Sequence, residues 1–326
     1  MIISQTPLRI SFTGGGTDLQ DFWSVEEGQV ISSAIDKYIH VIIKERFDEL
    51  IVLNYTKREI VKHVDDIKHD LIREAIRITG IKKGVEIQTL ADIPSEGSGL
   101  GSSSSVTVGL LNAFYAYKSE QVSPERLARE ACQIEIDILK NPIGKQDQYI
   151  AAFGGTKRIT FKPDGQVQVD PIRITVDNLR VWGSNLLLFF TNLTRKSSTI
   201  LKEQKKSTDD HRDILRKMKD QVPLLNTILE NEPPFDAAGN LLHEGWLLKQ
   251  SLSDKISNED INDMYKTALD GGALGGKISG AGGGGFLMLY VQREKQNRVR
   301  QMLKNYRELP FLLERDGSKI IFNNRR

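Results

Sequence analysis

Residues 95–111, SEGSGLGSSSSVTVGLL, place three alternating glycines and four serines directly before an apolar run. The serines stand where a helix would begin, and the first turn of a helix leaves backbone N–H groups unpaired and partly positive. Glycines before such a turn let a phosphate approach the backbone closely. Serine hydroxyls can bind phosphate oxygens or Mg²⁺, which prefers oxygen ligands. The stretch therefore predicts a site for the phosphates of a nucleotide.

The spacing in this stretch differs from that of three common phosphate-binding motifs. A Walker A loop needs Gly-Lys-Ser/Thr, and no lysine lies between Ser95 and Tyr117. A dinucleotide-binding fingerprint needs a third glycine where Ser102 stands. A protein-kinase loop would be accompanied by VAIK and DFG motifs, neither of which occurs. A flexible turn followed by a serine-capped helix remains the simple alternative.

A second glycine stretch, PLRISFTGGGTD at residues 7–18, follows a predicted strand. A carboxylate on a tight glycine turn suits a sugar, because it accepts hydrogen bonds from pairs of hydroxyls. Asp18 is therefore a candidate sugar ligand, and the alternative is a plain turn in which Asp18 caps a helix.

The third stretch is richer still, because nine of the fifteen residues from Gly271 to Gly285 are glycine. Such a run loses much conformational entropy on folding, so a use for it is expected. In KISGAGGGG, residues 277–285, only the backbone after Ser279 is available to contact a ligand. The alternative is a crossing of two chain segments that leaves no room for side chains.

Composition limits the class of protein. With 326 residues, 39% hydrophobic and 27% charged, two globular domains are expected. The net charge of +2 is too small to predict a nucleic-acid or membrane-surface partner, and we expect neither a signal peptide nor a membrane-spanning segment. The single thiol, Cys132, cannot form an intrachain disulfide, so we expect a core thiol and a cytoplasmic location. The five histidines show no metal-ligand spacing.

Strand-like and helix-like segments mix without strict alternation, which favours an α+β fold over a doubly wound sheet. Strands are predicted near residues 7–12, 38–47, 85–94, 154–161, 167–174, 180–192 and 285–290. Helices are predicted near residues 59–80, 106–120, 123–142, 197–219, 222–230, 235–251, 258–270 and 292–308. In the helix at 123–142, Leu127, Ala131, Ile134 and Ile138 share an apolar face. Glu135 lies at the edge of that face, from where a carboxylate can point into a cleft.

The three glycine stretches, in this order, resemble the motifs of the GHMP kinases, which include galactokinase, homoserine kinase, mevalonate kinase and phosphomevalonate kinase. PLRISFTGGGTD resembles the first motif, IPSEGSGLGSSSS the second and KISGAGGGG the third, so the resemblance covers nearly the whole chain. It implies a two-domain α+β fold divided into residues 1–180 and 181–326. It also implies a left-handed βαβ unit in the first domain, against the usual right-handed rule, and a ferredoxin-like second domain.

The resemblance also implies site residues. ATP phosphates would be wrapped by Gly97, Ser98, Gly99, Leu100, Gly101, Ser102, Ser103, Ser104 and Ser105. Mg²⁺ would be held by Ser103 and Glu135. Asp147 matches the catalytic aspartate, although NPIGKQD is one residue longer than the mevalonate-kinase version, and Arg9 matches the basic residue near the transferred phosphoryl group. The substrate side would be formed by Gly15, Gly16, Thr17, Asp18, Lys277, Gly280 and Gly282.

Within the family, GGGTD, GLGSSSS and NPIGKQDQYIAAFGG resemble the heptose 7-phosphate kinases, which phosphorylate the anomeric hydroxyl of a phosphorylated heptose for GDP-heptose synthesis. Galactokinase and mevalonate kinase carry Glu-His where this chain has Gly15 and Gly16, which implies a more open sugar pocket. Alternatives are a kinase for a fucose-like or neutral sugar, an ATP-using decarboxylase, and a protein that senses nucleotide without chemistry.

The chemistry of phosphoryl transfer to a sugar phosphate indicates roles for individual residues. Asp147 can accept the proton of the sugar hydroxyl, and Arg9 or Lys145 would keep it ionised. The phosphate already on the substrate needs a cation, and Arg195 in TNLTRKSS, residues 191–198, is the candidate because arginine binds phosphate with two parallel hydrogen bonds. We expect a small sugar phosphate as the partner, no nucleic acid or membrane, and possible homodimerisation.

Overall fold

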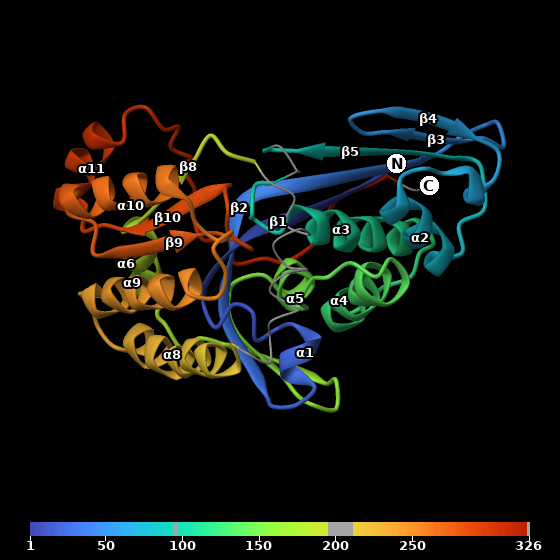
Figure 1. Cartoon of the computed structure of the whole chain (residues 1–326). Helices are drawn as coiled ribbons and strands as arrows, with labels where there is room; N and C mark the ends of the chain where they lie inside the picture. Colours follow the sequence, from blue (N-terminus) through green and yellow to red (C-terminus); the bar gives the residue numbers. More distant parts are fainter. Residues whose placement is uncertain (94–96, 195–210, 325–326) are drawn as a thin grey trace.

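The computed structural model describes residues 1–93, 97–194 and 211–324, which form two sheets with helices packed against each (Figure 1). The strands of the first half are β1 (Ile2–Thr13), β2 (Gly28–Glu45), β3 (Ile51–Asn54), β4 (Arg58–Val61), β5 (Val85–Ala91), β6 (Thr156–Phe161) and β7 (Val167–Pro171). Its helices are α1 (Gln20–Trp23), α2 (Asp70–Thr79), α3 (Ser102–Tyr117), α4 (Pro124–Cys132) and α5 (Gln146–Phe153). The second half contains α6 (Val176–Ser184), β8 (Leu186–Phe190), α8 (Arg212–Glu230), α9 (Asp236–Gln250), α10 (Glu259–Gly271), β9 (Gly275–Ile278), β10 (Phe286–Tyr290), α11 (Gln296–Met302) and β11 (Lys319–Asn323).

The first sheet has the order β11-β1-β2-β5-β3-β4, and β6 and β7 extend from β2. Its long strand β2 pairs with β1 and also with two further strands, because residues 28–33 pair with β6 and residues 39–45 pair with β5. Helices α2, α3, α4 and α5 lie on one side of the sheet (Figure 1), and α3 contacts both β1 and β2. The segment β3-α2-β5 joins two parallel neighbouring strands, and its left-handed crossover stays a prediction.

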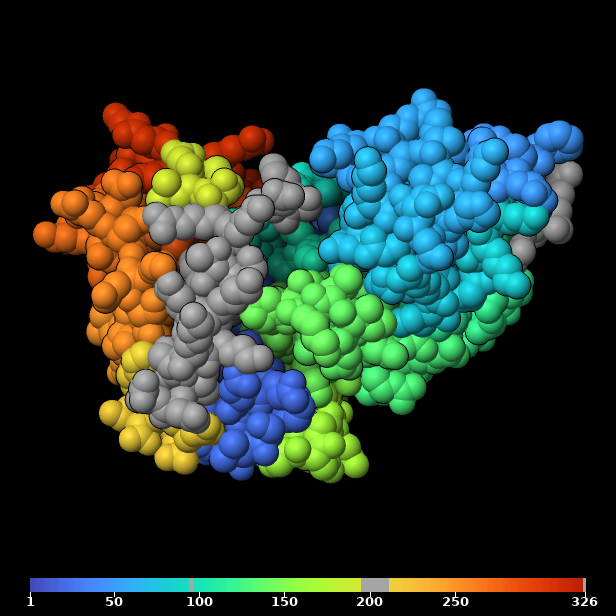
Figure 2. Space-filling view, turned by 45° about the vertical axis from the view of Figure 1, so that its right-hand side comes forward, coloured from blue at the N-terminus to red at the C-terminus, as the bar shows by residue number. Residues whose placement is uncertain are grey.

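The second sheet has the order β8-β10-β9, and residues 307–309 hydrogen-bond along the free side of β8. Counted along the chain, these four segments follow the β-α-β-β-α-β order of a ferredoxin-like domain, except that the helices α8, α9 and α10 lie between β8 and β9. Helix α9 packs on β9, and α8 packs on α9. Figure 2 shows the two halves as neighbouring masses, with the second half in orange and red beside the first half in blue to green.

One of the two hydrophobic core clusters spans both halves, and the smaller one lies mainly in the second half. Trp182 of α6 is fully buried and makes an edge contact with Phe12 of β1 at a ring-centroid distance of 5.2 Å. Its other aromatic neighbours are Phe235 and Tyr290 of the second half. In addition β11 pairs with β1, so the end of the described chain lies in the first sheet rather than in the second half. Side-chain packing and the course of the chain therefore both cross the boundary near residue 180.

Four of the predicted helices differ most from the structure. The helix at 59–80 is wrong in its first half, because Arg58–Val61 pairs with β3 and only Asp70–Thr79 is α-helical, ending at Gly80 as expected. The helix at 123–142 is α-helical to Cys132 and continues as a π-helix over Gln133–Ile138, which leaves Ile138 exposed instead of on the apolar face. The helices at 197–219 and 222–230 form one helix from Arg212, and residues 195–210 lie outside the described residues.

No helix among the described residues has the length and apolar composition that crossing a membrane requires.

Candidate active site

The cavity that concerns function lies where the three glycine stretches meet, and its volume is about 300 Å³. From the second stretch its wall includes Gly97, Ser98, Gly99, Gly101, Ser102, Ser103 and Ser104. From the other two stretches and the motif around residue 147 it includes Gly15, Gly16, Asp18, Asp147, Lys277, Gly280 and Gly282. Residues far apart in the sequence are thus brought to one cavity, as the motifs predict.

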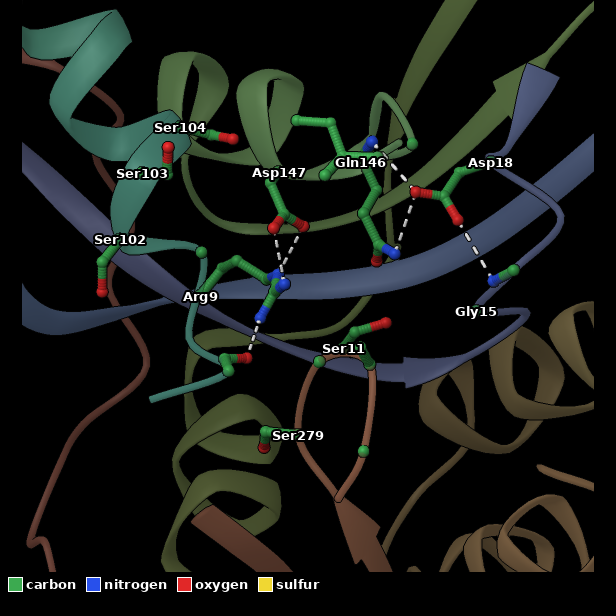
Figure 3. Close-up of a pocket in the computed structure, with 18 of the residues that line it drawn as sticks. Arg9, Ser11, Gly15, Asp18, Ser102, Ser103, Ser104, Gln146, Asp147 and Ser279 are labelled. Carbon is green, nitrogen blue, oxygen red and sulfur yellow. Dashed lines mark hydrogen bonds and ion pairs between the residues drawn. The ribbon is translucent and has the colours of Figure 1, made fainter. Parts of the chain in front are cut away.

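The glycine-serine stretch forms a loop that leads into α3. Gly101 is the N-cap of α3 with φ of +76°, a left-handed conformation that glycine adopts without strain, and Ser102 begins the helix. The N–H groups of a first helical turn have no partner within the helix, and Ser102, Ser103 and Ser104 of this turn line the cavity (Figure 3). The arrangement is that of an anion site at a helix N-terminus.

The second and third glycine stretches also touch each other. A Cβ atom on Gly99 would lie 2.3 Å from the carbonyl oxygen of Ser279, and one on Gly280 would lie 2.8 Å from the Cα of Gly99. A Cβ on Gly285 would lie 2.5 Å from the carbonyl oxygen of Ser98. The alternative of a close crossing is therefore confirmed for these positions, although Gly280 and Gly282 also line the cavity.

Arg9 and Asp147 form the central pair of the cavity. Arg9 Nε donates to one carboxylate oxygen of Asp147 at 2.7 Å and Nη2 donates to the other at 2.6 Å, while Nη1 donates to the Gly99 carbonyl at 2.6 Å (Figure 3). The Arg9 side chain is 5% exposed and the Asp147 side chain 24%. A bidentate pair of this kind fixes the orientation of both groups. Arg9 thus connects the carboxylate to the phosphate-binding loop.

Asp18 is buried, and it lies on the side of Asp147 that is away from Ser103 (Figure 3). Its carboxylate accepts hydrogen bonds from the Gly16 amide at 3.1 Å and from Gln146 Nε2 at 3.1 Å. Burial raises the pKa of Asp18, and the charge of Asp147 raises it further. The charges of the two carboxylates therefore repel each other across the cavity. Helix α5 positions both Asp147 and Gln146, which donates to Asp18.

Glu135 is fully buried in the π-helical segment, in which Leu139 N donates to the Ile134 carbonyl. Its carboxylate accepts from Ser103 Oγ at 2.8 Å and from Gln148 Nε2 at 2.7 Å. Burial raises the pKa of Glu135 to about 7. A cation beside this carboxylate would offset the cost of burying its charge.

The residues predicted to hold Mg²⁺ fit that ion. Mg²⁺ is usually held by one or two protein oxygens together with phosphate oxygens and water, and Ser103 and Glu135 offer such a pair beside the helix N-terminus. In the described ranges, no three His, Cys, Asp or Glu side chains cluster as a complete protein-built metal site would require.

Four predicted site residues are not part of the cavity wall. Thr17 Oγ1 is buried and donates to the Gly14 and Gln29 carbonyls, so it holds the glycine turn rather than a substrate. Ser105 Oγ donates to the Pro7 carbonyl at 2.8 Å, which ties α3 to β1. Leu100 is buried in the core. The Lys145 ammonium lies 4.0 Å from the centre of the Trp23 ring and donates to the Gly165 carbonyl, outside this cavity.

The prediction for Arg195 falls outside the described residues. Other cavity residues were not predicted from the sequence, namely Ser11, Leu19, Asn141, Pro142, Ile143, Gly144, Gln146, Lys249, Ser279, Ala281 and Gly284. Lys249 is the most informative of them, because it is only 6% exposed although it is a lysine. A signal existed in the sequence: Lys249 follows Trp246 by three positions and Leu242 by seven, and both are buried on the same helix face.

Family models match two parts of the chain. The model of the GHMP kinases N terminal domain matches residues 54–155, and the model of the GHMP kinases C terminal matches residues 229–308. A D-glycero-alpha-D-manno-heptose 7-phosphate kinase of Campylobacter jejuni is 30% identical over 93% of this chain and 93% of its own length. The chain belongs to the GHMP kinase family. It is therefore an ATP-dependent sugar kinase, as the motifs predict, and its two-domain α+β fold is that of the family.

Solved structures agree with this membership. The chain is 26% identical to a D-glycero-D-manno-heptose 1-phosphate kinase from Bacteriodes thetaiotaomicron, with a TM-score of 0.77 and full coverage of both chains. It is 28% identical to a putative sugar kinase from Campylobacter jejuni, with a TM-score of 0.76 over 98% of this chain and 97% of that one. A phosphomevalonate kinase of Streptococcus pneumoniae, 16% identical with a TM-score of 0.77 over 98% of this chain and all of that one, shares the fold.

Proposed function

We propose that this kinase transfers the terminal phosphoryl group of ATP to the anomeric hydroxyl of D-glycero-D-manno-heptose 7-phosphate, which gives the 1,7-bisphosphate used for GDP-heptose synthesis. The observation that carries the proposal is the position of the Arg9–Asp147 pair between the N-terminus of α3 and Asp18. The similarity to the heptose 7-phosphate kinase of Campylobacter jejuni supports the choice of sugar.

Each part of this arrangement has a defined task. The amides of the loop and of the first turn of α3 bind the phosphates of ATP, and the Arg9 guanidinium lies beside the group that is transferred. Asp147 takes the proton of the attacking hydroxyl, which contributes roughly 10²–10⁴-fold to the rate. Asp18 accepts hydrogen bonds from other hydroxyls of the sugar and so orients it.

Mg²⁺ would be held by Ser103 and Glu135, and when bound it supplies positive charge that offsets the phosphates. The ionised form of Glu135 is the form that binds a cation. Because its pKa lies at about 7, the affinity for Mg²⁺ is expected to fall as the pH drops below 7. The cytoplasmic location expected from the single thiol stays a prediction.

The test is ADP release with Mg·ATP and a panel consisting of the heptose 7-phosphate, the free heptose, fucose and galactose. We expect turnover to be fastest with the heptose 7-phosphate and to require a divalent cation. Equal or faster turnover with a free sugar would favour a neutral-sugar kinase, and CO₂ release from a phosphorylated acid would favour a decarboxylase. No turnover with any sugar phosphate would exclude the proposal.

A further inference from the structure

Two pairs of side chains approach the cavity, one from β1 of the first sheet and one from the end of β9 in the second sheet. Arg9 and Ser11 lie two positions apart on β1, and Lys277 and Ser279 lie two positions apart at the end of β9. Because side chains alternate along a strand, the members of each pair point to the same side. All four line the cavity, and Lys249 of α9 joins them. In Figure 3, Ser11 and Ser279 lie below the Arg9 guanidinium, whereas Asp147, Ser103 and Ser104 lie above it.

The two lysines of this group have no carboxylate partner among the described residues. Lys249 is 6% exposed and donates to the carbonyls of Ile278 and Gly280. Lys277 is 5% exposed and donates to the Phe12 carbonyl at 3.0 Å. An ammonium has three donors, so one on Lys249 and two on Lys277 are unused. Two buried positive charges held only by carbonyls are costly unless an anion compensates them.

The charges of the two lysines act on each other. Burial lowers the pKa of Lys249, and the charges of Lys277 and Arg9 lower it further. Burial likewise lowers the pKa of Lys277 to about 8; Arg9 contributes in the same direction and Asp18 opposes it. Asp18 already accepts from Gly16 and Gln146. An anion beside Lys249 and Lys277 would therefore stabilise their charged forms.

Two serine hydroxyls of the cluster are also unpaired. Ser11 is 5% exposed and Ser279 is 1% exposed, and neither Oγ has a hydrogen-bond partner among the described residues. Buried polar groups in folded proteins are nearly always paired, so water or a ligand in the cavity would complete the hydrogen bonding of both hydroxyls. Two hydroxyls and two ammonium groups are the donors that a phosphate dianion accepts.

We propose that a phosphate-binding site for the phosphate that the sugar already carries is formed by Ser11, Lys249, Lys277 and Ser279. This proposal rests on the function proposed above. The phosphates of ATP have other partners, because the start of α3 with Ser103 and Ser104 lies on the other side of Arg9 in Figure 3, away from Ser11 and Ser279. The charge of Asp18 raises the pKa of Lys277, so a sugar bound by Asp18 lies near enough to this lysine for its second phosphate to reach the cluster.

This phosphate-binding site would make the enzyme selective for phosphorylated sugars. A neutral sugar leaves both buried ammonium groups and both hydroxyls without an acceptor, and a site with unpaired buried polar groups rejects such a ligand strongly. The selectivity would thus arise within the described residues, whatever Arg195 contributes.

The cleanest test is Ser279→Ala, because in the free protein the hydroxyl has no hydrogen bond to lose. We expect its thermal unfolding midpoint to equal that of the wild type. The KM for heptose 7-phosphate should rise about tenfold or more, since a hydrogen bond to a charged group is lost. The KM for ATP and the affinity for the unphosphorylated heptose should stay within about twofold. Lys249→Met should raise the KM for heptose 7-phosphate further, and Lys249→Arg should restore part of it.

Ser105→Ala is the matched control, because this buried serine donates to the Pro7 carbonyl and lies outside the cavity wall. It should lower the unfolding midpoint and leave the KM for heptose 7-phosphate unchanged. Ser279→Ala is expected to show the opposite combination.

Two results would overturn the proposed phosphate-binding site. If the KM for ATP rises in parallel with that for the sugar phosphate, the cluster binds the nucleotide. If neither KM changes in Ser279→Ala, the hydroxyl does not contact a substrate, and this variant decides the matter even where Lys249→Met does not fold. Failure of the proposed function is distinct, because the wild-type enzyme would then not phosphorylate the heptose 7-phosphate at all.

Discussion

Replacing Gly99 by alanine tests the contact between the second and third glycine stretches. Gly99 has φ of +73°, and a Cβ atom there would lie 2.3 Å from the Ser279 carbonyl oxygen, where ordinary contacts begin at 3.4 Å. The two loops must therefore part by about 1 Å. The left-handed backbone costs an alanine about 1–2 kcal/mol, and overpacking typically adds about 1–3 kcal/mol. We expect the free energy of unfolding to fall by about 2–5 kcal/mol.

The matched control is Gly80→Ala, at the end of α2. Gly80 has φ of +72°, but nothing lies within 4 Å of its Cβ position. It therefore carries the backbone penalty alone, about 1–2 kcal/mol. The difference between the two variants in denaturant unfolding isolates the contact between the loops.

Gly99→Ala should also reduce catalysis. Its carbonyl accepts the Arg9 Nη1 hydrogen bond at 2.6 Å, so a displaced loop also displaces the guanidinium. A misplacement of about 1 Å can cost roughly 10²-fold in rate. The reasoning fails if Gly99→Ala is no less stable than Gly80→Ala and has the same kcat and the same KM for ATP.

Three further variants test individual side chains. Asp147→Asn should lower kcat by about 10²–10⁴-fold while ATP binding, measured by titration calorimetry, is retained; a wild-type rate would refute its role as the base. Because burial raises the pKa of Glu135 from 4.5 to about 7, the folded protein keeps a proton that the unfolded chain releases, so the free energy of unfolding falls as pH rises through this window. The loss amounts to about 3 kcal/mol; Glu135→Gln should remove it in denaturation measured without divalent cations, and an unchanged slope would contradict the assignment. Lys145→Met should change kcat by less than about threefold, since the ammonium contacts the Trp23 ring and the Gly165 carbonyl; a drop in kcat beyond about 10²-fold would return Lys145 to the catalytic residues.

Local sequence patterns were sufficient for much of the fold. The turn at Gly80, the Ser123 cap and the start of α3 depend on a few neighbouring residues, so they could be predicted. The strand at Arg58–Val61 could not, because its partner β3 and not its own periodicity determines its conformation. The switch from α- to π-helix at Gln133 likewise has no local signal, although it positions Glu135.

The site shows the same division. Arg9, Asp18 and Asp147 lie in motifs that can be recognised in the sequence, and the three residues meet in one cavity. Lys249 has no motif, because its burial depends on the third glycine stretch passing over the end of α9. Thr17 and Ser105 have the residue type that binds ligands but donate to backbone carbonyls instead, a choice that only the folded chain determines.

The pairing of β11 with β1 has a consequence for synthesis. The strand that carries Arg9 has a neighbour on both edges only after residues 319–323 have been translated. The roughly 300 intervening residues take about 15–60 s at the usual ribosomal rate of 5–20 residues per second. Until then β1 exposes an open edge, which is a template for association with other nascent chains. Newly made protein should therefore depend on chaperones during that interval more than the finished enzyme does.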